Sequence, residues 1–350
     1  MNMIIQCTPR LLRAADNLVR DSFAVRPGEG VLITADTRTE TALLDAVVAS
    51  VLRAGAQPVV TLCPVLPYQG GLSDPFVPDA LRAAMAAADV WLDLCFPYHA
   101  GSTGHSAAIA AKRCRYGLVA IGSTASLERI YGCVDFPALM DFNIALAEFV
   151  RDAVGEAVRF TCPRGSDLRF ELDAMKLVRP RSAVEPGIYT VPGTQSLYPK
   201  PGTTRGRIVI QALFDEYYRA LRLPITIEAE GRITRLAGGA AEDRSSFHRA
   251  LIRAGGEAGG YGGFVHFTCG FHPGTMMTGQ QFIEDIRVPG TNAIGMGLPW
   301  WEPGGGENHP DGIVFDQSLW IGDIRLMDEG VFVGPEPLAR LHAAMTRRLD

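Results

Sequence analysis

Residues 31–62 read VLITADTRTETALLDAVVASVLRAGAQPVVTL. This stretch begins and ends with short runs of β-type residues, Val31–Thr34 and Val59–Leu62. Between them, apolar residues recur at helical spacing until Gly55, and a glycine at such a point is typical of a helix end. A strand, a helix and a second strand in this order predict a parallel sheet flanked by helices.

The same alternation extends over the first 155 residues. Thr37 and Glu40 have the spacing of a capping box at the start of the helix. Further elements are predicted as strands at Val90–Leu94 and Leu118–Ile121, and as helices at Asp79–Ala88 and from Pro137 to near Val154. No Gly-x-Gly-x-x-Gly opens a helix after any of these strands, so the sequence does not support a dinucleotide cofactor.

After Gly155 the sequence changes to short β-type runs separated by Gly and Pro. The predicted strands are Val158–Cys162, Leu168–Leu172, Arg207–Ile210, Ile225–Glu228, Arg232–Leu236, Phe264–Thr268 and Ile313–Phe315. The proline-rich stretch from Pro180 to Thr204 predicts an ordered loop. We therefore expect an α/β domain over residues 1–155 and a β-rich α+β domain over residues 156–350.

Composition excludes several classes of function. The net charge of -5, the pI near 5.8 and the lack of a basic run argue against a nucleic-acid partner. No apolar run approaches the length of a membrane span, which predicts a cytoplasmic protein with no membrane partner. The seven cysteines include no Cys-x-x-Cys pair, so neither a disulfide framework nor a thiolate zinc site is predicted.

His309-Pro310-Asp311 places an imidazole and a carboxylate two residues apart. In an extended segment such residues point the same way, so both could bind one cation. His266 is the candidate for a third ligand, and two histidines with one carboxylate are best known for holding Fe(II) for oxygen chemistry.

Each of these residues also has an interpretation without a metal. Asp311-Gly312 is typical of a turn, and the turn alone would explain the segment. Val265 and Phe267 alternate with His266 and are expected to face the core, which leaves His266 facing a cleft or solvent. A solvated or hydrogen-bonded strand histidine fits that pattern equally well.

Two other histidines are candidates for a functional site. His99 follows the predicted strand Val90–Leu94, and ligands of open α/β sheets meet the loops at the carboxyl ends of strands. Ser102 and its neighbouring glycines could instead mark the start of a helix without a role. His272 is close enough in sequence to His266 to share a site, or it is an ordinary loop histidine.

Four segments carry a family resemblance that covers nearly the whole chain. They are Gly165-Ser166-Asp167-Leu168, Glu230-Gly231-Arg232-Ile233, the His266 strand and His309-Pro310-Asp311. With these segments the chain resembles the aminopeptidase T family of metallopeptidases. It resembles more closely the iron-dependent offshoot of that family, the 2,5-dihydroxypyridine 5,6-dioxygenases of nicotinate breakdown.

The resemblance implies an aminopeptidase T-like fold, a site for Fe(II) and a ring-cleaving reaction. It maps the iron ligands onto His266, His309 and Asp311, and an active-site histidine onto His99. We add Tyr98, Glu185 and His272 as candidates for substrate contact, and Trp300 and Trp301 as an aromatic wall or as simple packing. The implied partners are a small aromatic or N-heteroaromatic substrate, dioxygen and further copies of the chain in a homo-oligomer.

Departures from both groups refine this prediction. The aminopeptidases hold two metals and use a glutamate where this chain has His266, and further ligands in a segment matching Asn292–Gly297, which has no ionisable group here. The dioxygenase has a second active-site histidine near the position of Val191, so the pocket is expected to fit a different ring.

Two other functions remain open from the sequence. A metallopeptidase would need carboxylates such as Glu302 and Glu307 to replace the missing ligands. A protein that only binds a small aromatic compound would need no turnover at all.

Overall fold

The computed structural model describes residues 7–176, 181–255, 259–299 and 309–346. The chain forms two compact units. The first contains Met1–Met140, Arg179–Pro192 and Met345–Asp350, and the second contains Asp141–Val178 and Gly193–Ala344. The division into domains at residue 155 stays a prediction, because compactness alone does not define a domain boundary.

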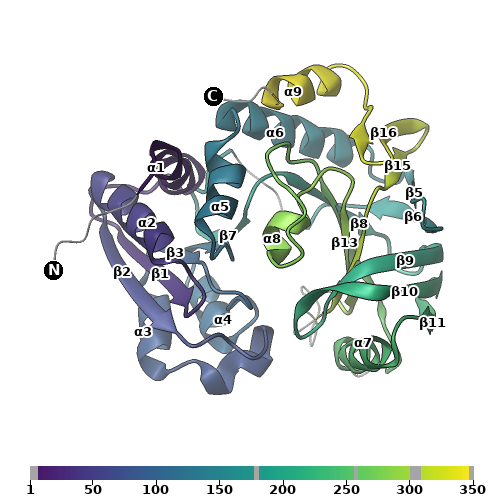
Figure 1. Cartoon of the computed structure of the whole chain (residues 1–350), viewed down its shortest axis with the longest axis horizontal. Helices are drawn as coiled ribbons and strands as arrows, with labels where there is room; N and C mark the ends of the chain where they lie inside the picture. Colours follow the sequence, from purple (N-terminus) through teal and green to yellow (C-terminus); the bar gives the residue numbers. More distant parts are fainter. Residues whose placement is uncertain (1–6, 177–180, 256–258, 300–308, 347–350) are drawn as a thin grey trace. The chain divides into compact units, whose positions relative to one another are not determined.

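A parallel five-stranded sheet forms the centre of the first unit (Figure 1). Its strands, in spatial order, are β2 (Gln57–Cys63), β1 (Gly30–Asp36), β3 (Val90–Asp93), β4 (Arg115–Leu118) and β7 (Gly187–Thr190). All four pairings are parallel, as the alternation of strands and helices predicts.

Helices cover both faces of this sheet (Figure 1). On one face lie α1 (Pro9–Asp16), its π-helical continuation Asn17–Ser22 and α2 (Thr41–Arg53), and on the other lie a 3-10 segment (Gly70–Phe76), α3 (Asp79–Ala87) and α4 (Thr103–Ala110). Trp91 and Tyr116 of the sheet pack with Leu81 and Met85 of α3 in one buried cluster. This cluster anchors the loop that follows β3.

Two local predictions for this unit are wrong. The fourth strand spans Arg115–Leu118 instead of Leu118–Ile121, and Ala120 has a φ of 45°, which no strand residue adopts. Thr37 and Glu40 do not form a capping box: helix α2 begins at Thr41, and the Glu40 carboxylate accepts hydrogen bonds from the backbone and hydroxyl of Thr124.

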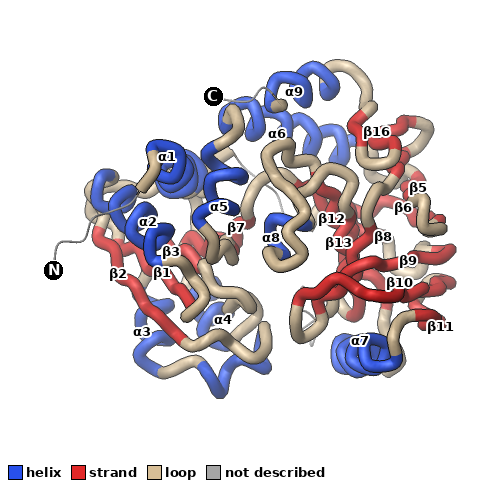
Figure 2. Tube along the Cα trace, viewed as in Figure 1, coloured by secondary structure: helices blue, strands red, loops and turns tan. Residues whose placement is uncertain are grey.

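A twelve-stranded antiparallel sheet dominates the second unit (Figure 2). In spatial order it contains β11 (Ile233–Gly238), β10 (Tyr218–Glu230), β9 (Arg205–Phe214), β14 (Asp311–Val314), β13 (Asn292–Gly297), β12 (Gly263–Gly270), β8 (Thr194–Pro199), β6 (Asp167–Asp173), β5 (Ala157–Thr161), β15 (Ser318–Ile321), β16 (Ile324–Asp328) and β17 (Val331–Phe332). An additional pairing joins β9 to β6, so six strands close into a ring.

Phenylalanine side chains fill part of the core behind this sheet. Phe267 of β12 stacks on Phe170 of β6, with ring centroids 4.5 Å apart, and also meets Phe160 and Phe264. Val265 and Phe267 are buried, as their alternation with His266 predicts. The apolar face of β12 therefore fixes the direction in which His266 points.

The seven strands predicted for this half are all present, with longer bounds in most cases. The stretch from Pro180 to Thr204 is not one loop, because it contains β7, which pairs with β4, and β8, which pairs with β12. Among the described residues of this stretch, the prolines flank these strands or end β8 at Pro199, positions where a missing N–H is tolerated.

The remaining helices are α5 (Thr124–Leu127) with its π-helical continuation Glu128–Gly132, α6 (Phe136–Asp152), α7 (Ala241–Ala254), α8 (Phe282–Asp285) and α9 (Leu338–Met345). None of the helices in the described ranges combines the length and the apolar character that crossing a membrane requires.

Replacing Phe267 by alanine should destabilise the second unit, because it removes a fully buried ring from the phenylalanine core. We expect the free energy of unfolding to fall by about 3–5 kcal/mol, measured by urea denaturation. Val331→Ala, at a largely exposed position, serves as the control and should change little. A loss in Phe267→Ala no larger than that of the control would contradict this account of the core.

Candidate metal centre

Three neighbouring strands position His266 and Asp311. In the hydrogen-bonded register, His266 of β12 lies opposite Gly295 of β13, and Gly295 lies opposite Asp311 of β14. Residues opposite each other in an antiparallel sheet point to the same face. The two ligands therefore face the same side, separated by a strand that has no side chain at that position.

His309 joins them from the segment before β14. The Nε2 atoms of His266 and His309 lie 3.3 Å apart. Asp311 Oδ1 lies 3.6 Å from His266 Nε2, and Asp311 Oδ2 lies 3.9 Å from His309 Nε2. The structure thus brings together the three residues predicted as metal ligands, with their ligand atoms within 4.8 Å of one another.

These distances suit a metal ion. Two ligand atoms each about 2.1 Å from a metal, at angles of about 90 to 110°, lie about 3.0 to 3.4 Å from each other. The observed separations are at this range or slightly above it. Two nitrogen donors and one oxygen donor on one side of a cation leave its other side open, unlike a closed structural zinc site.

The charges of the three groups also suit a cation. Burial lowers the pKa of His309 to about 4, and burial together with the His309 ring lowers the pKa of His266 to about 3, so both imidazoles are neutral at pH 7. Burial raises the pKa of Asp311 to about 8. A buried carboxylate beside two neutral rings lacks a positive partner, and a divalent cation would supply one.

Two buried atoms of this group have no hydrogen-bond partner among the described residues. They are Asp311 Oδ1, which faces His266, and His309 Nδ1. A buried polar atom without a partner costs about 1 to 3 kcal/mol, so such atoms require an explanation. For the Asp311 oxygen, a bound metal ion would supply the missing partner.

Hydroxyl groups on the same face orient the His266 ring. Thr268, two residues further along β12, places its Oγ1 3.0 Å from His266 Nδ1. Ser196 of β8, opposite Thr268 in the register, lies 2.9 Å from the same hydroxyl. A hydrogen bond at Nδ1 fixes the ring and directs the Nε2 lone pair to the metal position.

Gly295 makes room for the His266 ring. A Cβ atom at this position would lie 2.5 Å from His266 Nε2 and 2.9 Å from Cε1, closer than atoms can pack. Only glycine therefore leaves the ring in place. The sequence shows that the segment Asn292–Gly297 lacks ionisable groups, but this role of Gly295 cannot be seen in it, because strand register is not visible in a sequence.

The other predicted site residues are placed as follows. His99 and Tyr98 lie in the loop after β3 of the first unit, where His99 is fully buried and Tyr98 is half-buried with its ring near Phe96. Glu185 is an exposed residue of the same unit, and its backbone carbonyl accepts a hydrogen bond from Tyr189. Their proposed roles toward a substrate stay predictions.

His272 is not part of the ligand group. Its ring is buried against Gly193, and its Nδ1 accepts a hydrogen bond from the Gly274 backbone. Within the described residues, the group with ligand atoms within 4.8 Å of one another contains His266, His309 and Asp311 but not His272. Trp300, Trp301, Glu302 and Glu307 lie outside the described residues.

Thr268, Ser196 and Asp93 are further residues that sequence reasoning missed. The spacing of two between His266 and Thr268 in a strand is a signal that could have found the first. Asp93 ends a buried strand of a parallel sheet, a position where polar residues are typical of ligand sites. Ser196 has no signal of its own, since it meets Thr268 only through strand pairing.

Comparison with known proteins shows the fold. No protein-family model matches the chain, and no curated protein matches it in sequence. Among solved structures, 2,5-dihydroxypyridine dioxygenase from Pseudomonas putida KT2440 is similar, with a TM-score of 0.69 and 16% identity over 94% of this chain and 99% of that one. AmpT from Thermus thermophilus has a TM-score of 0.59 and 13% identity, over 93% of this chain and 99% of that one.

The chain therefore has the aminopeptidase T-like fold, as the sequence predicted, with a parallel sheet between helices and a large antiparallel sheet. Identities this low show a shared architecture.

Gly295→Ala should weaken metal binding without unfolding the protein. The new methyl group would push the His266 ring away from the ligand position, while the strand backbone at residue 295 accepts alanine because its φ is not positive. We expect the affinity for Fe(II), titrated anaerobically, to fall by about 10- to 100-fold, the range for lost ligand orientation.

Gly263→Ala is the matched control for this substitution. Gly263 lies in β12, and a Cβ there would meet nothing within 4 Å. Equal affinities of the two variants would show that Gly295 does not shape the site.

Metal affinity should depend on pH through Asp311. Below about pH 8 a metal ion must displace the Asp311 proton, whereas the imidazoles carry no proton above about pH 4. The apparent association constant should therefore rise about tenfold per pH unit up to about pH 8 and then level off. Calorimetric titration at several pH values measures this slope, and a flat profile would exclude a protonated Asp311 in the metal-free protein.

Proposed function

We propose that this chain is a mononuclear non-haem Fe(II) dioxygenase that opens a hydroxylated aromatic or N-heteroaromatic ring similar to 2,5-dihydroxypyridine. One observation carries the proposal: two neutral imidazoles and one buried carboxylate converge on a single side of a cation position. This ligand set with open positions is the one best known in non-haem iron oxygenases.

A bound Fe(II) would supply open coordination positions and the ability to exchange electrons with dioxygen. The chain's own residues set the conditions for that chemistry. His266 is held by Thr268 at Nδ1, so its Nε2 points to the metal position. Asp311 contributes the single negative charge of the ligand set, so with Fe(II) bound the centre would keep a net positive charge, which would favour an anionic hydroxyl group of the substrate.

We further propose that His99 is the general base that takes the proton of the substrate hydroxyl. An imidazole changes its charge near neutral pH and can accept and return a proton. Tyr98, Glu185 and His272 are proposed as substrate contacts of lower rank. Val191, where the dioxygenases carry a histidine, is expected to make the pocket fit a different ring.

The second candidate function is a metallopeptidase, since AmpT shares the fold. A two-metal hydrolytic centre needs bridging and terminal carboxylates. Strand β13, which lies between the ligand strands, has none, and Gly295 occupies its central position. Asp311 is the one carboxylate that the described residues contribute to the ligand group. These features favour one metal over a two-metal hydrolytic centre.

Oxygen uptake by the Fe(II)-loaded protein tests the proposal. After anaerobic reconstitution, we expect one Fe(II) per chain and one dioxygen consumed per ring opened with at least one dihydroxypyridine or related hydroxylated ring, both oxygen atoms entering the product. Two zinc ions per chain with hydrolysis of aminoacyl anilides in the absence of oxygen would instead establish the peptidase.

His309→Ala should abolish this oxygen uptake, because a ligand is lost and the affinity for Fe(II) falls with it. His248→Ala is the matched control, since His248 is an exposed histidine of α7 that pairs with Tyr261. Full uptake by His309→Ala would remove His309 from the ligand set.

A further inference from the structure

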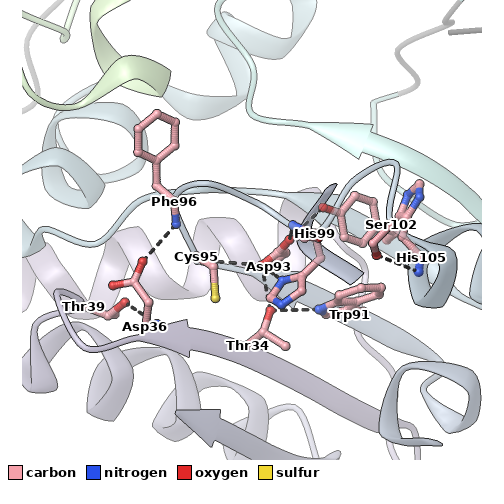
Figure 3. Close-up of polar contacts among 12 residues, drawn as sticks. Thr34, Asp36, Thr39, Trp91, Asp93, Cys95, Phe96, His99, Ser102 and His105 are labelled. Carbon is pink, nitrogen blue, oxygen red and sulfur yellow. Dashed lines mark hydrogen bonds and ion pairs between the residues drawn. The ribbon is translucent and has the colours of Figure 1, made fainter. Parts of the chain in front are cut away.

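A second cluster of polar side chains lies at the carboxyl end of the parallel sheet in the first unit. The strand order places β1 between β2 and β3, so the connections run in opposite directions from β1. Open α/β sheets with this order bind ligands at the switch point between the first and third strands. Asp36 ends β1 and Asp93 ends β3, at that point (Figure 3).

Asp93 is fully buried and accepts hydrogen bonds on both oxygens. Its Oδ2 accepts from the backbone N–H of His99 at 2.7 Å and from the Tyr116 hydroxyl at 2.8 Å. Its Oδ1 accepts from the Thr34 hydroxyl at 2.8 Å and lies 3.0 Å from His99 Nδ1 (Figure 3). The Cys95 backbone N–H adds a longer contact of 3.3 Å to Oδ1.

The neighbouring contacts determine which group donates and which accepts in these hydrogen bonds. Trp91 Nε1–H donates to Thr34 Oγ1 at 2.9 Å, so the Thr34 hydroxyl hydrogen is free to point at Asp93. Burial acts to raise the pKa of Asp93. The positive charge that the His99 ring carries when it is protonated, together with the hydrogen bonds from His99 and Thr34, outweighs burial and lowers the pKa. Asp93 is therefore a carboxylate that only accepts, and the His99 nitrogen beside it must donate.

His99 Nε2 is the remaining polar atom of the pair. It is buried and has no hydrogen-bond partner among the described residues, although the ring itself is fixed by Asp93 and by Trp91, whose ring centroid is 5.7 Å away. With the proton on Nδ1, Nε2 carries a lone pair. A fixed imidazole with an unused lone pair at a ligand-binding edge is the arrangement of a general base.

A metal ion is the competing explanation, since ligand atoms of Asp93, Cys95 and His99 lie within 4.8 Å of one another. A metal would need Asp93 to give up donors that already satisfy it, and it would need a thiolate. Burial and the negative charges of Asp93 and Asp36 raise the pKa of the Cys95 thiol well above its usual range. The cluster therefore suits an Asp–His pair better than a metal site.

We propose that Asp93 is a positioning residue that holds His99 as the tautomer with its proton on Nδ1, so that Nε2 accepts a proton from a bound ligand. The identity of that ligand rests on the proposed function, in which a hydroxyl group of the substrate ring gives up the proton. The assignment of the His99 tautomer does not depend on the proposed function. Other titratable groups that interact with Asp93 or His99 are Tyr116 of β4, Cys95 of the same loop, Cys63 of β2 and His105 of α4.

Asp93→Asn is the variant that reverses the tautomer. An asparagine can place its carbonyl at the Oδ2 position, where it still accepts from the His99 backbone and from Tyr116. Its NH₂ group then occupies the Oδ1 position and donates to His99 Nδ1 and to Thr34 Oγ1, whose hydroxyl hydrogen turns away, while the long contact from the Cys95 N–H is lost. The ring proton is thereby forced onto Nε2, and the base loses its lone pair at that atom.

Nitrogen NMR of the full chain at pH 7 measures directly which nitrogen of the His99 ring carries the proton. The chain has seven histidines, and comparison with His99→Gln assigns the His99 signals. We expect Nδ1–H in the wild type and Nε2–H in Asp93→Asn. Tyr116→Phe removes one donor to Asp93 and should keep Nδ1–H. A wild-type ring that carries its proton on Nε2, or an unchanged tautomer in a folded Asp93→Asn, overturns the proposal.

Catalysis provides a second measurement. With a ring compound that the wild type opens, kcat of Asp93→Asn should fall by about 10²- to 10⁴-fold, the range for loss of a general base. Asp89→Asn, at a partly exposed carboxylate that pairs with Arg113, is the matched control and should keep its rate. If no ring is opened by the wild type, the proposed function fails while NMR still decides the role of Asp93. If the ring is opened and kcat of Asp93→Asn is unchanged, the inference fails alone.

Discussion

The candidate metal centre depends on the register of three antiparallel strands. His266, Gly295 and Asp311 lie side by side across β12, β13 and β14, and the ligands meet because the middle residue has no side chain. A slip of one residue would turn every side chain of a strand to the opposite face. The buried phenylalanines behind β12 oppose such a slip, since it would expose them. Core packing and ligand placement are thus one constraint.

Each unit contains a buried aspartate, and the surroundings of the two carboxyl groups are opposite in character. In the first unit Asp93 is surrounded by hydrogen-bond donors, and these donors together with the His99 ring stabilise its negative charge. In the second unit Asp311 has neutral imidazoles as neighbours and an oxygen without a hydrogen-bond partner among the described residues, so burial raises its pKa to about 8. The first arrangement is suited to orienting an imidazole, and the second to attracting a divalent cation.

Sequence patterns predicted the two architectures and the three candidate ligands that the structure brings together, because periodicity, glycine positions and His-x-Asp spacing are local properties. They failed where distant strands decide the outcome. Strand β13 lacks a strong β-type pattern, β7 and β8 were hidden by prolines, and the role of Gly295 exists only through its pairing with His266. The start of α2 was missed for a similar reason, since the Glu40 side chain bonds to Thr124, 84 residues away, instead of to a backbone N–H at the start of its own helix. Local patterns predict the helices and strands, whereas the geometry of the site depends on residues that are distant in the chain.

Strand β7 has a consequence for how the chain is made. The first unit takes its edge strand from residues 187–190, beyond the first helix and two strands of the second unit, so neither unit is a continuous piece of sequence. During synthesis, about 70 further residues must be translated after β4 before its partner strand β7 leaves the ribosome. Translation proceeds at about 5–20 residues per second. Until then β4 is an open strand edge, the kind of surface that pairs wrongly with other chains. A fragment ending near residue 155 would keep that edge permanently, so the order of elements along the chain makes the two units depend on each other already during translation.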